Sequence, residues 1–548
     1  MLATYSPLAG LDPAEPIQAV VAEQLASWTN HRLKLDQSWI QIAAPASQIP
    51  EQGWKLHVSA TPVSAPEVLR RVLPLLLEAG VEFKAAQTTR QLGLLNEGQA
   101  GTRSQVGKFI TVYPRDDEQA VTLARALDAA TFGLDGPTIP SDRAVRPGSL
   151  VHYRYGGFRQ RTAISPVGVV MAMLVDPNNR LVPDKREPWF SAPEWATDPF
   201  EQAGLTVRAQ PQPGPIGTRY RVRRALQQSG KGGVYLADDR SVDPARPVVI
   251  KEGRRAVTTD RSGRDARARI DHEHALLQRL SPAPYVPAVY DHFEQEGNHF
   301  LVLELLQGQS LRSWLGPRGL RGEQLSSAEI GDLAHKLFAI LEWAHAAGVV
   351  LRDFNPNNIM RDDAGRLRLI DLEISHASDD PLPAFYGWTR AFARTQARQP
   401  ESLPVPADDY FSLGATLFFI ATLANPVLAD DGRERQTRLS DLLDQLRPDL
   451  PAPLRQVILA LLATDEGAEV DLAALRQLLD APQAPRQPAP TAAPDLGALH
   501  ELAVGLGDWI LETARPEHPD HCWAPPPGAY TMLPISIQYG APGTGLFL

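Results

Sequence analysis

Apolar and polar side chains alternate along residues 53–62, GWKLHVSATP. This period of two predicts a β-strand with one apolar face and one polar face. Lys55 and His57 fall together on the polar face. A solvated edge strand would explain the lysine, because charged edge residues discourage pairing with other chains. A binding or catalytic face is the alternative, and the rest of the sequence has to decide between the two.

Longer-range periodicity predicts two differently built regions. The first mixes strand-like runs (WKLHVSA, KFITVYP, VHYRYGGF) with a helical run, PEVLRRVLPLLLEAG, which indicates an α+β domain. The second begins with the strand patterns VVIKEG and HFLVLELL and then turns strongly helical, as in EIGDLAHKLFAILEWAHAAG. A small sheet lobe followed by a helical lobe is therefore expected.

Two proline-rich segments separate these regions. Residues 209–218, AQPQPGPIGT, are aperiodic, and residues 481–494, APQAPRQPAPTAAP, form a low-complexity run typical of an extended spacer. We therefore expect domains at residues 1–208, 219–480 and 495–548.

Composition narrows the class of protein. The 548 residues are 43% hydrophobic and 22% charged, with a net charge of −10 and scattered basic residues, so no nucleic-acid surface is indicated. No apolar run is long enough for a membrane span, and the N-terminus lacks signal-peptide features. Cys522 is the single cysteine, which excludes a disulfide framework or a thiolate-rich metal site. A cytoplasmic protein is predicted.

The most specific motif is VVLRDFNPNNIM, followed by RLRLIDLE. Asp353 and Asn358 lie five positions apart, and Asp371 follows Asn358 by thirteen. These spacings resemble the protein-kinase catalytic loop H-R-D-x-x-x-x-N and the downstream D-F-G. Upstream, VVIK places Lys251 where the nucleotide lysine of a kinase lies, and Glu273, on a helical pattern, is its expected partner. Farther on, DYFSLG resembles the start of the long buried helix of a kinase large lobe.

The kinase resemblance assigns a role to each of these residues. Phosphoryl transfer consists mostly of positioning and charge neutralisation. Lys251, oriented by Glu273, would hold the α- and β-phosphates of ATP (or GTP). Asn358 and Asp371 would supply hard oxygen ligands for Mg²⁺. Asp353 would accept the proton of an incoming Ser or Thr hydroxyl.

The sequence departs from the kinase pattern in the catalytic segments. Leu351 replaces the usual His, Asn355 the usual Lys, and Leu372-Glu373 the usual Phe-Gly. Glu373 would either add a carboxylate near the metal ions or be a solvated side chain. No clear A-P-E motif follows, so ordinary activation-loop switching is not expected. A kinase fold without activity is the alternative to an active enzyme.

The glycine-rich loop QQSGKGGVYLA is also incomplete. Gly232 matches the third glycine of G-x-G-x-x-G-x-V, and Val234 follows it, but Gln227 and Ser229 stand in place of the first two glycines. Its position before VVIK supports a nucleotide-binding role, and Gly230 adds freedom for a close approach to phosphates.

The first domain contributes basic residues beside the Lys-x-His strand. Lys84 lies in VEFKAAQTTR, Lys108 in VGKFITVYP and Arg154 in VHYRYGGF. Together these segments resemble the N-terminal lyase domain of class III and class IV lanthipeptide synthetases, which is similar to bacterial phosphothreonine lyases. The resemblance covers most of residues 30–200.

This resemblance implies a β-elimination of phosphate. Lys84 would be the base that removes the Cα proton, which requires a pKa lowered by burial and neighbouring cations. Lys55 would stabilise the developing oxyanion. His57 would protonate the departing phosphate, and Arg154 would hold it in a bidentate fork.

Two further basic residues, Lys108 and Arg103, are phosphate candidates, with plain surface charge as the alternative. The lyase half requires no metal or organic cofactor. If the interpretation is right, Lys55, His57, Lys84 and Arg154 converge on one pocket with room for a phosphate. If the lysine and histidine of the first strand face open solvent, it fails.

The C-terminal segment resembles the opening of a lanthipeptide cyclase domain, a helical barrel. LHELAVGLGDWILETA is a helical pattern, and the sequence ends in the apolar SIQYGAPGTGLFL. We therefore expect a cyclase domain truncated near its start, which leaves class III and class IV undistinguished. Cys522 is not expected to be a zinc ligand.

The expected fold class is thus multidomain: an α+β phosphothreonine-lyase-like domain, a bilobal protein-kinase-like fold and a short helical start of an α-barrel cyclase. The expected function is a bifunctional dehydratase acting on a ribosomal precursor peptide with a leader and a Ser/Thr/Cys core. A homodimer is left open. The alternatives are a bacterial Ser/Thr signalling kinase with an N-terminal binding domain, and a pseudokinase-like scaffold that binds peptides.

Overall fold

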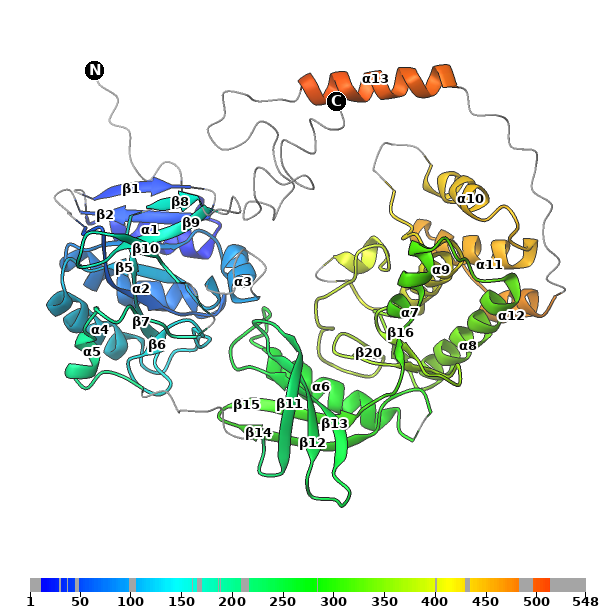
Figure 1. Cartoon of the computed structure of the whole chain (residues 1–548), viewed down its shortest axis with the longest axis horizontal. Coiled ribbons are helices and arrows are strands. Elements are labelled where there is room, and N and C mark those ends of the chain that lie inside the picture. The colour runs from blue at the N-terminus through cyan, green and yellow to red at the C-terminus, as the bar shows by residue number, and fades with distance from the viewer. Residues whose placement is uncertain are drawn as a thin grey trace.

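The protein consists of a sheet domain, a two-lobed domain and a separate C-terminal helix (Figure 1). The computed structural model describes residues 11–512 except 29–30, 37, 45–48, 98–104, 160, 165–169, 186, 188, 208–215, 283, 400–401, 429–433 and 482–495. Most of both predicted linkers, Arg103 and Cys522 lie outside the described residues. Within the described part of the chain, no helix combines the length and apolarity needed to cross a bilayer.

The sheet domain is built on a seven-stranded antiparallel sheet in the order β1-β2-β4-β5-β3-β7-β6. The strands are β1 (Arg32–Leu35), β2 (Trp39–Ala43), β3 (Gln52–Val58), β4 (Glu82–Ala86), β5 (Ile110–Tyr113), β6 (Arg143–Ala144) and β7 (Val151–Gly157). The helices are α1 (Pro16–Leu25), α2 (Ala65–Glu78), α3 (Thr89–Glu97), α4 (Asp117–Thr131) and α5 (Pro199–Gln202). A smaller sheet follows, with β8 (Thr162–Ile164), β9 (Val170–Val175) and β10 (Leu181–Pro183), and β9 contacts β7.

The strand that carries the alternating pattern lies in the interior of the sheet. β3 is hydrogen-bonded to β5 on one side and to β7 on the other. Its apolar side chains, such as Leu56, enter a core formed with α1, α2 and α4. Its polar side chains are also buried, because Lys55 is only 9% exposed and His57 only 3%. The edge-strand explanation is therefore wrong, and two buried polar groups on one face require another reason.

The two-lobed domain begins with a five-stranded antiparallel sheet in the order β11-β12-β13-β15-β14, against which α6 packs. Its elements are β11 (Tyr220–Gln228), β12 (Gly233–Asp239), β13 (Arg246–Gly253), α6 (Ala266–Arg279), β14 (Val289–Gln295) and β15 (Asn298–Glu304). The large lobe contains α7 (Leu311–Leu320), α8 (Ser327–Ala346), α9 (Pro406–Thr422), α10 (Arg435–Leu446), α11 (Ala452–Leu462) and α12 (Leu472–Asp480). Short strands complete it: β16 (Gln309–Ser310), β17 (Val349–Val350), β18 (Ile359–Arg361), β19 (Leu367–Leu369) and β20 (His376–Ala377), with the 3₁₀ turns Gln396–Arg398 and Ala463–Glu466.

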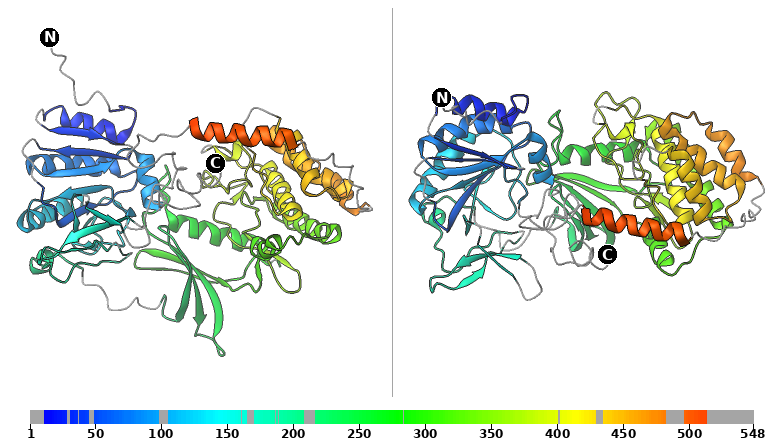
Figure 2. Two further views of the ribbon diagram at one scale, coloured as in Figure 1. Left: turned by 45° about the horizontal axis from the view of Figure 1, so that its top comes forward. Right: turned by 90° about the horizontal axis from the view of Figure 1, so that it is seen from above.

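The sheet domain faces the small lobe through α3 (Figure 2). A methyl group added at Gly230, in the loop between β11 and β12, would lie 2.7 Å from the carbonyl oxygen of Asn96 in α3. A salt bridge of 2.6 Å joins Arg255 to Asp135 across the same boundary. The loop between β11 and β12 thus contacts both domains.

The helical pattern predicted near the C-terminus forms α13 (Leu496–Glu512). Several of its apolar side chains are exposed, including Leu502 and Trp509. Residues 513–548 lie outside the described residues.

Helix α9 is the most deeply buried helix of the large lobe, and it approaches α11 at Gly414, in the DYFSLG motif. A Cβ at this position would lie 2.7 Å from Leu461 Cβ and 3.0 Å from the backbone nitrogen of Leu462. Neither atom is at the end of a flexible side chain, so an added methyl would force the helices apart.

We expect Gly414→Ala to lower the free energy of unfolding by about 1–3 kcal/mol, because the overpacking exceeds the gain in helix propensity. Gly331→Ala is the matched control. Gly331 lies inside α8 with no atom near the position of an added Cβ, so that substitution should be neutral or stabilise by up to about 1 kcal/mol. Calorimetric unfolding of the full chain measures both, and equal effects would contradict the packing argument.

Candidate active sites

The polar face of the large sheet forms one wall of a cavity of about 520 Å³. Six basic side chains line it: Lys55, Lys84, Lys108, Arg154, Arg159 and Arg161. His57 lines the same cavity, together with the carboxylates of Asp36, Glu82 and Asp184. The excess of cations gives the cavity a positive potential that favours an anion such as phosphate.

Strand register explains how residues far apart in sequence meet in this cavity. Lys55 is paired with Arg154 across β3 and β7. His57 is paired with Thr111 across β3 and β5, and Thr111 is paired in turn with Lys84 on β4. Because paired residues in an antiparallel sheet point to the same face, all of these side chains project toward the cavity.

A buried carboxylate, that of Asp142, holds two of the basic groups. His57 Nδ1 contacts Asp142 Oδ2, and Lys108 Nζ lies 3.0 Å from Asp142 Oδ1. Lys108 is 3% exposed, so the surface-charge alternative for this residue is wrong. Burial opposes ionisation of Asp142, but Lys108 and His57 outweigh it and hold the pKa of the carboxyl group well below its usual range.

His57 is a neutral imidazole at neutral pH. Burial and the neighbouring Lys108 lower its pKa to about 3, although Asp142 acts in the opposite direction. With Nδ1 facing the carboxylate, Nδ1 carries the proton, and the ring offers Nε2 as its second polar atom.

Arg154 is positioned by a carboxylate, and Lys55 is positioned by a backbone carbonyl group. Arg154 donates from Nη2 to Asp184 Oδ1 at 2.7 Å, and Lys55 Nζ donates to the carbonyl oxygen of Gly157 at 2.7 Å. Gly156 gives both side chains room, because a Cβ there would lie 3.2 Å from Lys55 Cε and 3.4 Å from Arg154 Nη2.

Lys84, on β4, is half-buried, and its Nζ lies 4.0 Å from the centre of the Trp39 ring. No predicted role of the four residues Lys55, His57, Lys84 and Arg154 is tested by this placement alone, but all four line one cavity.

Sequence analysis missed the two carboxylates that organise the cavity. Asp142 lies 85 positions from His57, and Asp184 lies 30 positions from Arg154. Both are in irregular segments without periodicity or motif. The only available signal was physical: several basic groups buried on one face require counter-charges from elsewhere in the chain.

The second candidate site lies between the two lobes. Lys251 Nζ on β13 lies 2.7 and 2.9 Å from the two carboxylate oxygens of Glu273 on α6, and 3.1 Å from Asp371 Oδ1. Burial alone would lower the pKa of Lys251, but Asp371 and Glu273 outweigh it and raise it above its usual value. The lysine is therefore a permanent cation, as the predicted phosphate-holding role requires.

Asp353 lies in the loop between β17 and β18, within an amide network. Asn358 Nδ2 donates to Asp353 Oδ2 at 2.7 Å, and Asn355 Nδ2 donates to Asp353 Oδ1 at 2.7 Å. Asn355 also reaches the Thr389 hydroxyl at 3.4 Å, so an amide occupies the position of the usual lysine. Burial and the nearby Asp371 raise the pKa of Asp353.

The residues predicted to hold Mg²⁺ fit that ion. The β18–β19 pairing brings them together, because the nitrogen of Ile370 donates to the carbonyl oxygen of Asn358 at 2.9 Å. Asn358 directs its amide nitrogen to Asp353, which leaves its amide oxygen as the ligand atom, and Asp371 adds a carboxylate. These are the hard oxygen donors that Mg²⁺ prefers.

The loop between β11 and β12 reaches this site through one of its side chains. Gly232 has a φ of 151°, and a Cβ there would lie 1.8 Å from the carbonyl oxygen of Glu252, so glycine is required. Lys231 in the same loop forms a 2.5 Å ion pair with Glu373. Glu373, which replaces the usual glycine, is therefore paired with a lysine and is not simply solvated. Its predicted alternative role, a carboxylate near the metal ions, stays a prediction. Val234 continues the loop into β12.

The segment after Asp371 is held by hydrogen bonds from Arg352. Arg352 donates from Nη1 to the carbonyl oxygens of Ile374 and Phe385 at 2.9 and 2.6 Å. The buried Asp409 of the DYFSLG motif accepts from the backbone nitrogens of Leu351 and Arg352 at 2.7 and 2.6 Å. The segment after Asp371 is thus anchored through backbone atoms, and the predicted absence of ordinary activation-loop switching stays a prediction.

A bilobal fold with this Lys–Glu pair and this Asp–Asn–Asp set defines a protein kinase, here preceded by a second, cation-lined domain. Comparison with known families agrees: residues 220–466 match the protein kinase domain, and residues 18–211 match the family described as RamC, N-terminal domain. The chain therefore combines a RamC N-terminal domain with a protein kinase domain. The protein kinase family implies the use of ATP and Mg²⁺. The matches end before the residues predicted to begin a cyclase, so that assignment stays a prediction.

One relative matches more than half of the chain. The "Probable SapB synthase" of Streptomyces coelicolor is 36% identical over 362 residues, which cover 64% of this chain and 38% of the relative. Others match the kinase region: "Serine/threonine-protein kinase PknA" of Nostoc sp. is 26% identical over 38% of both chains. "Probable serine/threonine-protein kinase PkwA" of Thermomonospora curvata is 32% identical over 45% of this chain and 32% of its own. The chain thus spans less than half of each of these relatives.

The low pKa of His57 has a measurable consequence. We expect its ring resonances to stay constant from pH 8 to pH 5 in the peptide-free protein, because the pKa is about 3. Unfolded chains bind that proton near pH 6.5, so the native state loses stability as the pH falls from about 6.5 toward 3. NMR titration of histidine-labelled protein, with the signal assigned by its loss in His57→Gln, measures the pKa. The denatured protein, titrating near pH 6.5, is the control, and a native pKa above 6 would contradict the expectation.

Proposed function

We propose that the protein is a bifunctional peptide dehydratase: its kinase domain phosphorylates Ser or Thr of a ribosomal precursor peptide with ATP or GTP, and its N-terminal domain eliminates the phosphate. The products would be dehydroalanine and dehydrobutyrine. The observation that carries the proposal is the cation-lined cavity, present in one chain with the Lys251–Glu273 pair and the Asp353, Asn358 and Asp371 set of a kinase.

The kinase step uses residues whose positions suit an in-line transfer. Lys251 would bind the α- and β-phosphates, and Asn358 and Asp371 would hold Mg²⁺, which neutralises charge on the transferred phosphoryl group. Asp353, fixed by Asn355 and Asn358, would orient the peptide hydroxyl and accept its proton.

In the elimination step, neutral Lys84 would take the Cα proton. The electron pair of the C–H bond would become the Cα=Cβ bond as the Cβ–O bond to phosphate breaks. Lys55, tied to the backbone at Gly157, would stabilise negative charge on the peptide carbonyl oxygen. Arg154, oriented by Asp184, would bind the phosphate.

His57 would act as the acid only when the phosphate is present. In the empty cavity, burial and Lys108 keep its pKa low. A phosphate dianion would offset those cations and raise the pKa of the imidazole, so the ring would take up a proton from solvent at Nε2 and donate it to the departing phosphate oxygen. Asp142 would fix the ring through Nδ1 and stabilise the imidazolium.

A Ser/Thr kinase that leaves its product phosphorylated is the second candidate, because several relatives are kinases whose names mention no further activity. Mass spectrometry of a Ser-containing precursor peptide with nucleotide and Mg²⁺ separates the candidates. A loss of about 18 Da per residue supports the dehydratase, and a persistent gain of about 80 Da, the mass of a phosphoryl group, supports the kinase alone. An unchanged mass supports a peptide-binding scaffold.

Lys84→Ala should leave a phosphorylated peptide, with elimination slowed by about 10²–10⁴-fold, because the variant lacks the base. Lys34→Ala is the matched control: Lys34 is an exposed lysine on β1 of the same sheet, and its loss should leave dehydration unchanged. Continued dehydration by Lys84→Ala would show that another group is the base.

Asp353→Asn should abolish both phosphorylation and dehydration of the unmodified peptide, because the kinase step comes first. The same variant should still eliminate phosphate from a synthetic phosphoserine peptide, since the cavity is intact. Asp363→Asn, at an exposed position in the turn between β18 and β19, is the control. If Asp353→Asn fails with the phosphopeptide as well, the two steps are not separate.

A further inference from the structure

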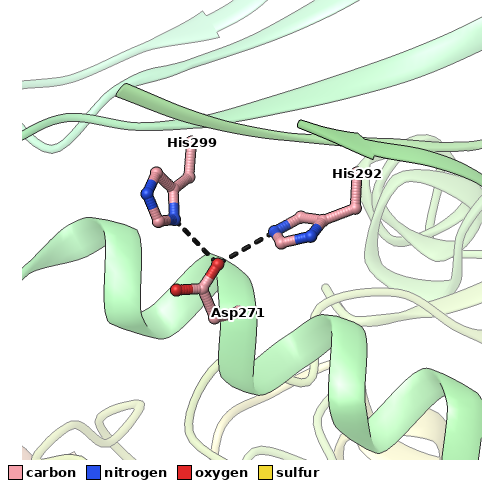
Figure 3. A group of neighbouring side chains, drawn as sticks. All are labelled: Asp271, His292 and His299. Carbon is pink, nitrogen blue, oxygen red and sulfur yellow. Dashed lines mark hydrogen bonds and ion pairs between the residues drawn. The ribbon is translucent and has the colours of Figure 1, made fainter. Parts of the chain in front are cut away.

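The small lobe carries a cluster of one aspartate and two histidines, none of which belongs to either candidate active site (Figure 3). Asp271 comes from α6, His292 from β14 and His299 from β15. His292 Nε2 lies 2.9 Å and His299 Nδ1 lies 2.8 Å from the same oxygen, Asp271 Oδ1. Both imidazoles point toward the carboxylate from the adjacent strands.

The fold places these three groups together for definite reasons. In the β14–β15 register, His299 is paired with Glu294 and His292 with Leu301. The two histidines are therefore diagonal neighbours on one face of the sheet, the face that α6 covers. Asp271 lies two positions before Glu273, about 200° around the helix, so it faces away from the cleft that Glu273 enters.

We propose that Asp271, His292 and His299 form a binding site for a divalent transition-metal ion of the zinc type. Two imidazole nitrogens and a carboxylate oxygen are a ligand set that such ions favour over Mg²⁺ or Ca²⁺. The three ligand atoms lie within 4.8 Å of one another, and a water molecule would complete a tetrahedral shell.

Binding requires only small movements of these side chains. Ligand atoms around tetrahedral zinc lie about 3.3 Å apart, since each bond is about 2.0 Å long. Each imidazole nitrogen would therefore move about half an ångström away from Asp271 Oδ1. The two nitrogens, which lie within 4.8 Å of each other, would settle at the same separation. The side chains are 23–45% exposed, which gives them room. The metal would replace the two N–H donors, and each neutral ring would carry its proton on the other nitrogen.

The site would act on the kinase through α6. Glu273 on this helix holds Lys251 at 2.7 Å and accepts from the backbone nitrogen of Leu372 at 3.1 Å. A metal joining α6 to β14 and β15 would add a third attachment on the opposite side of the helix. It would therefore stabilise the helix position in which Glu273 reaches Lys251.

The binding test uses the full chain with Cys522→Ser, stripped of metal by a chelator and held in excess Mg²⁺ to saturate the kinase site. Titration with Co²⁺ should give one visible-absorbing, non-thiolate site that Zn²⁺ displaces. His292→Gln and His299→Gln should each weaken binding by at least about tenfold. Glutamine keeps a donor for Asp271, so these variants are expected to fold.

The C-terminal segment supplies the competing explanation, because His518 and His521 are further potential ligands. The double variant His518→Gln/His521→Gln should therefore retain the site. If it loses Co²⁺ binding while His292→Gln and His299→Gln retain it, the proposal is overturned. Absence of stoichiometric binding in the parent protein overturns it as well, leaving a hydrogen-bonded cluster only.

Hydrogen–deuterium exchange tests the link to the kinase. Zn²⁺ should slow amide exchange along α6 in the Cys522→Ser protein and leave it unchanged in His292→Gln. Unchanged exchange in both proteins despite stoichiometric binding would overturn the proposed restraint on α6. This readout does not depend on dehydratase activity, so it is independent of the function proposed above.

Discussion

Several cations can share the polar face of one sheet only because carboxylates are buried among them. Asp142 contacts His57 and Lys108 together, and Asp184 contacts Arg154. Removing a partner from a buried charge is strongly destabilising, so these pairs fix the basic side chains in place before any substrate arrives. The same pairs leave the cavity short of negative charge, and a phosphate group would supply it. The buried carboxylates therefore hold the basic side chains of the N-terminal domain together, but they do not neutralise all of the positive charge that lines the cavity.

The kinase site follows the opposite pattern. Lys251, a half-buried lysine, faces two carboxylates, those of Glu273 and Asp371. Excess negative charge suits a site that has to accept a metal–nucleotide complex, because the metal brings the missing positive charge. In the proposed function, one half of the chain would receive an anion, and the other would receive a cation bound to an anion.

The loop between β11 and β12 joins these two halves. Gly230 packs against α3 of the sheet domain, while Lys231 pairs with Glu373 beside the kinase metal ligands. Glu373, which replaces the usual glycine, provides the partner for a lysine of the phosphate loop. A second departure from the kinase pattern also has defined partners. Asn355, which replaces the usual lysine, donates to both Asp353 and Thr389.

By itself, the sequence determined the properties that local periodicity and fixed spacing encode. Alternation placed Lys55 and His57 on one face, and the Asp353–Asn358–Asp371 spacing identified the catalytic segments of a kinase. Alternation is readable because side chains on a strand point to the same face every two residues. The kinase spacing is readable because a short loop with a fixed number of residues holds its functional side chains at fixed separations. The tertiary structure decided whether that face was an edge or an interior wall, and which carboxylates met it. Asp142, Asp184 and the Asp271–His292–His299 cluster come together only through strand register and helix packing, since contacts between distant segments leave no local period in the sequence.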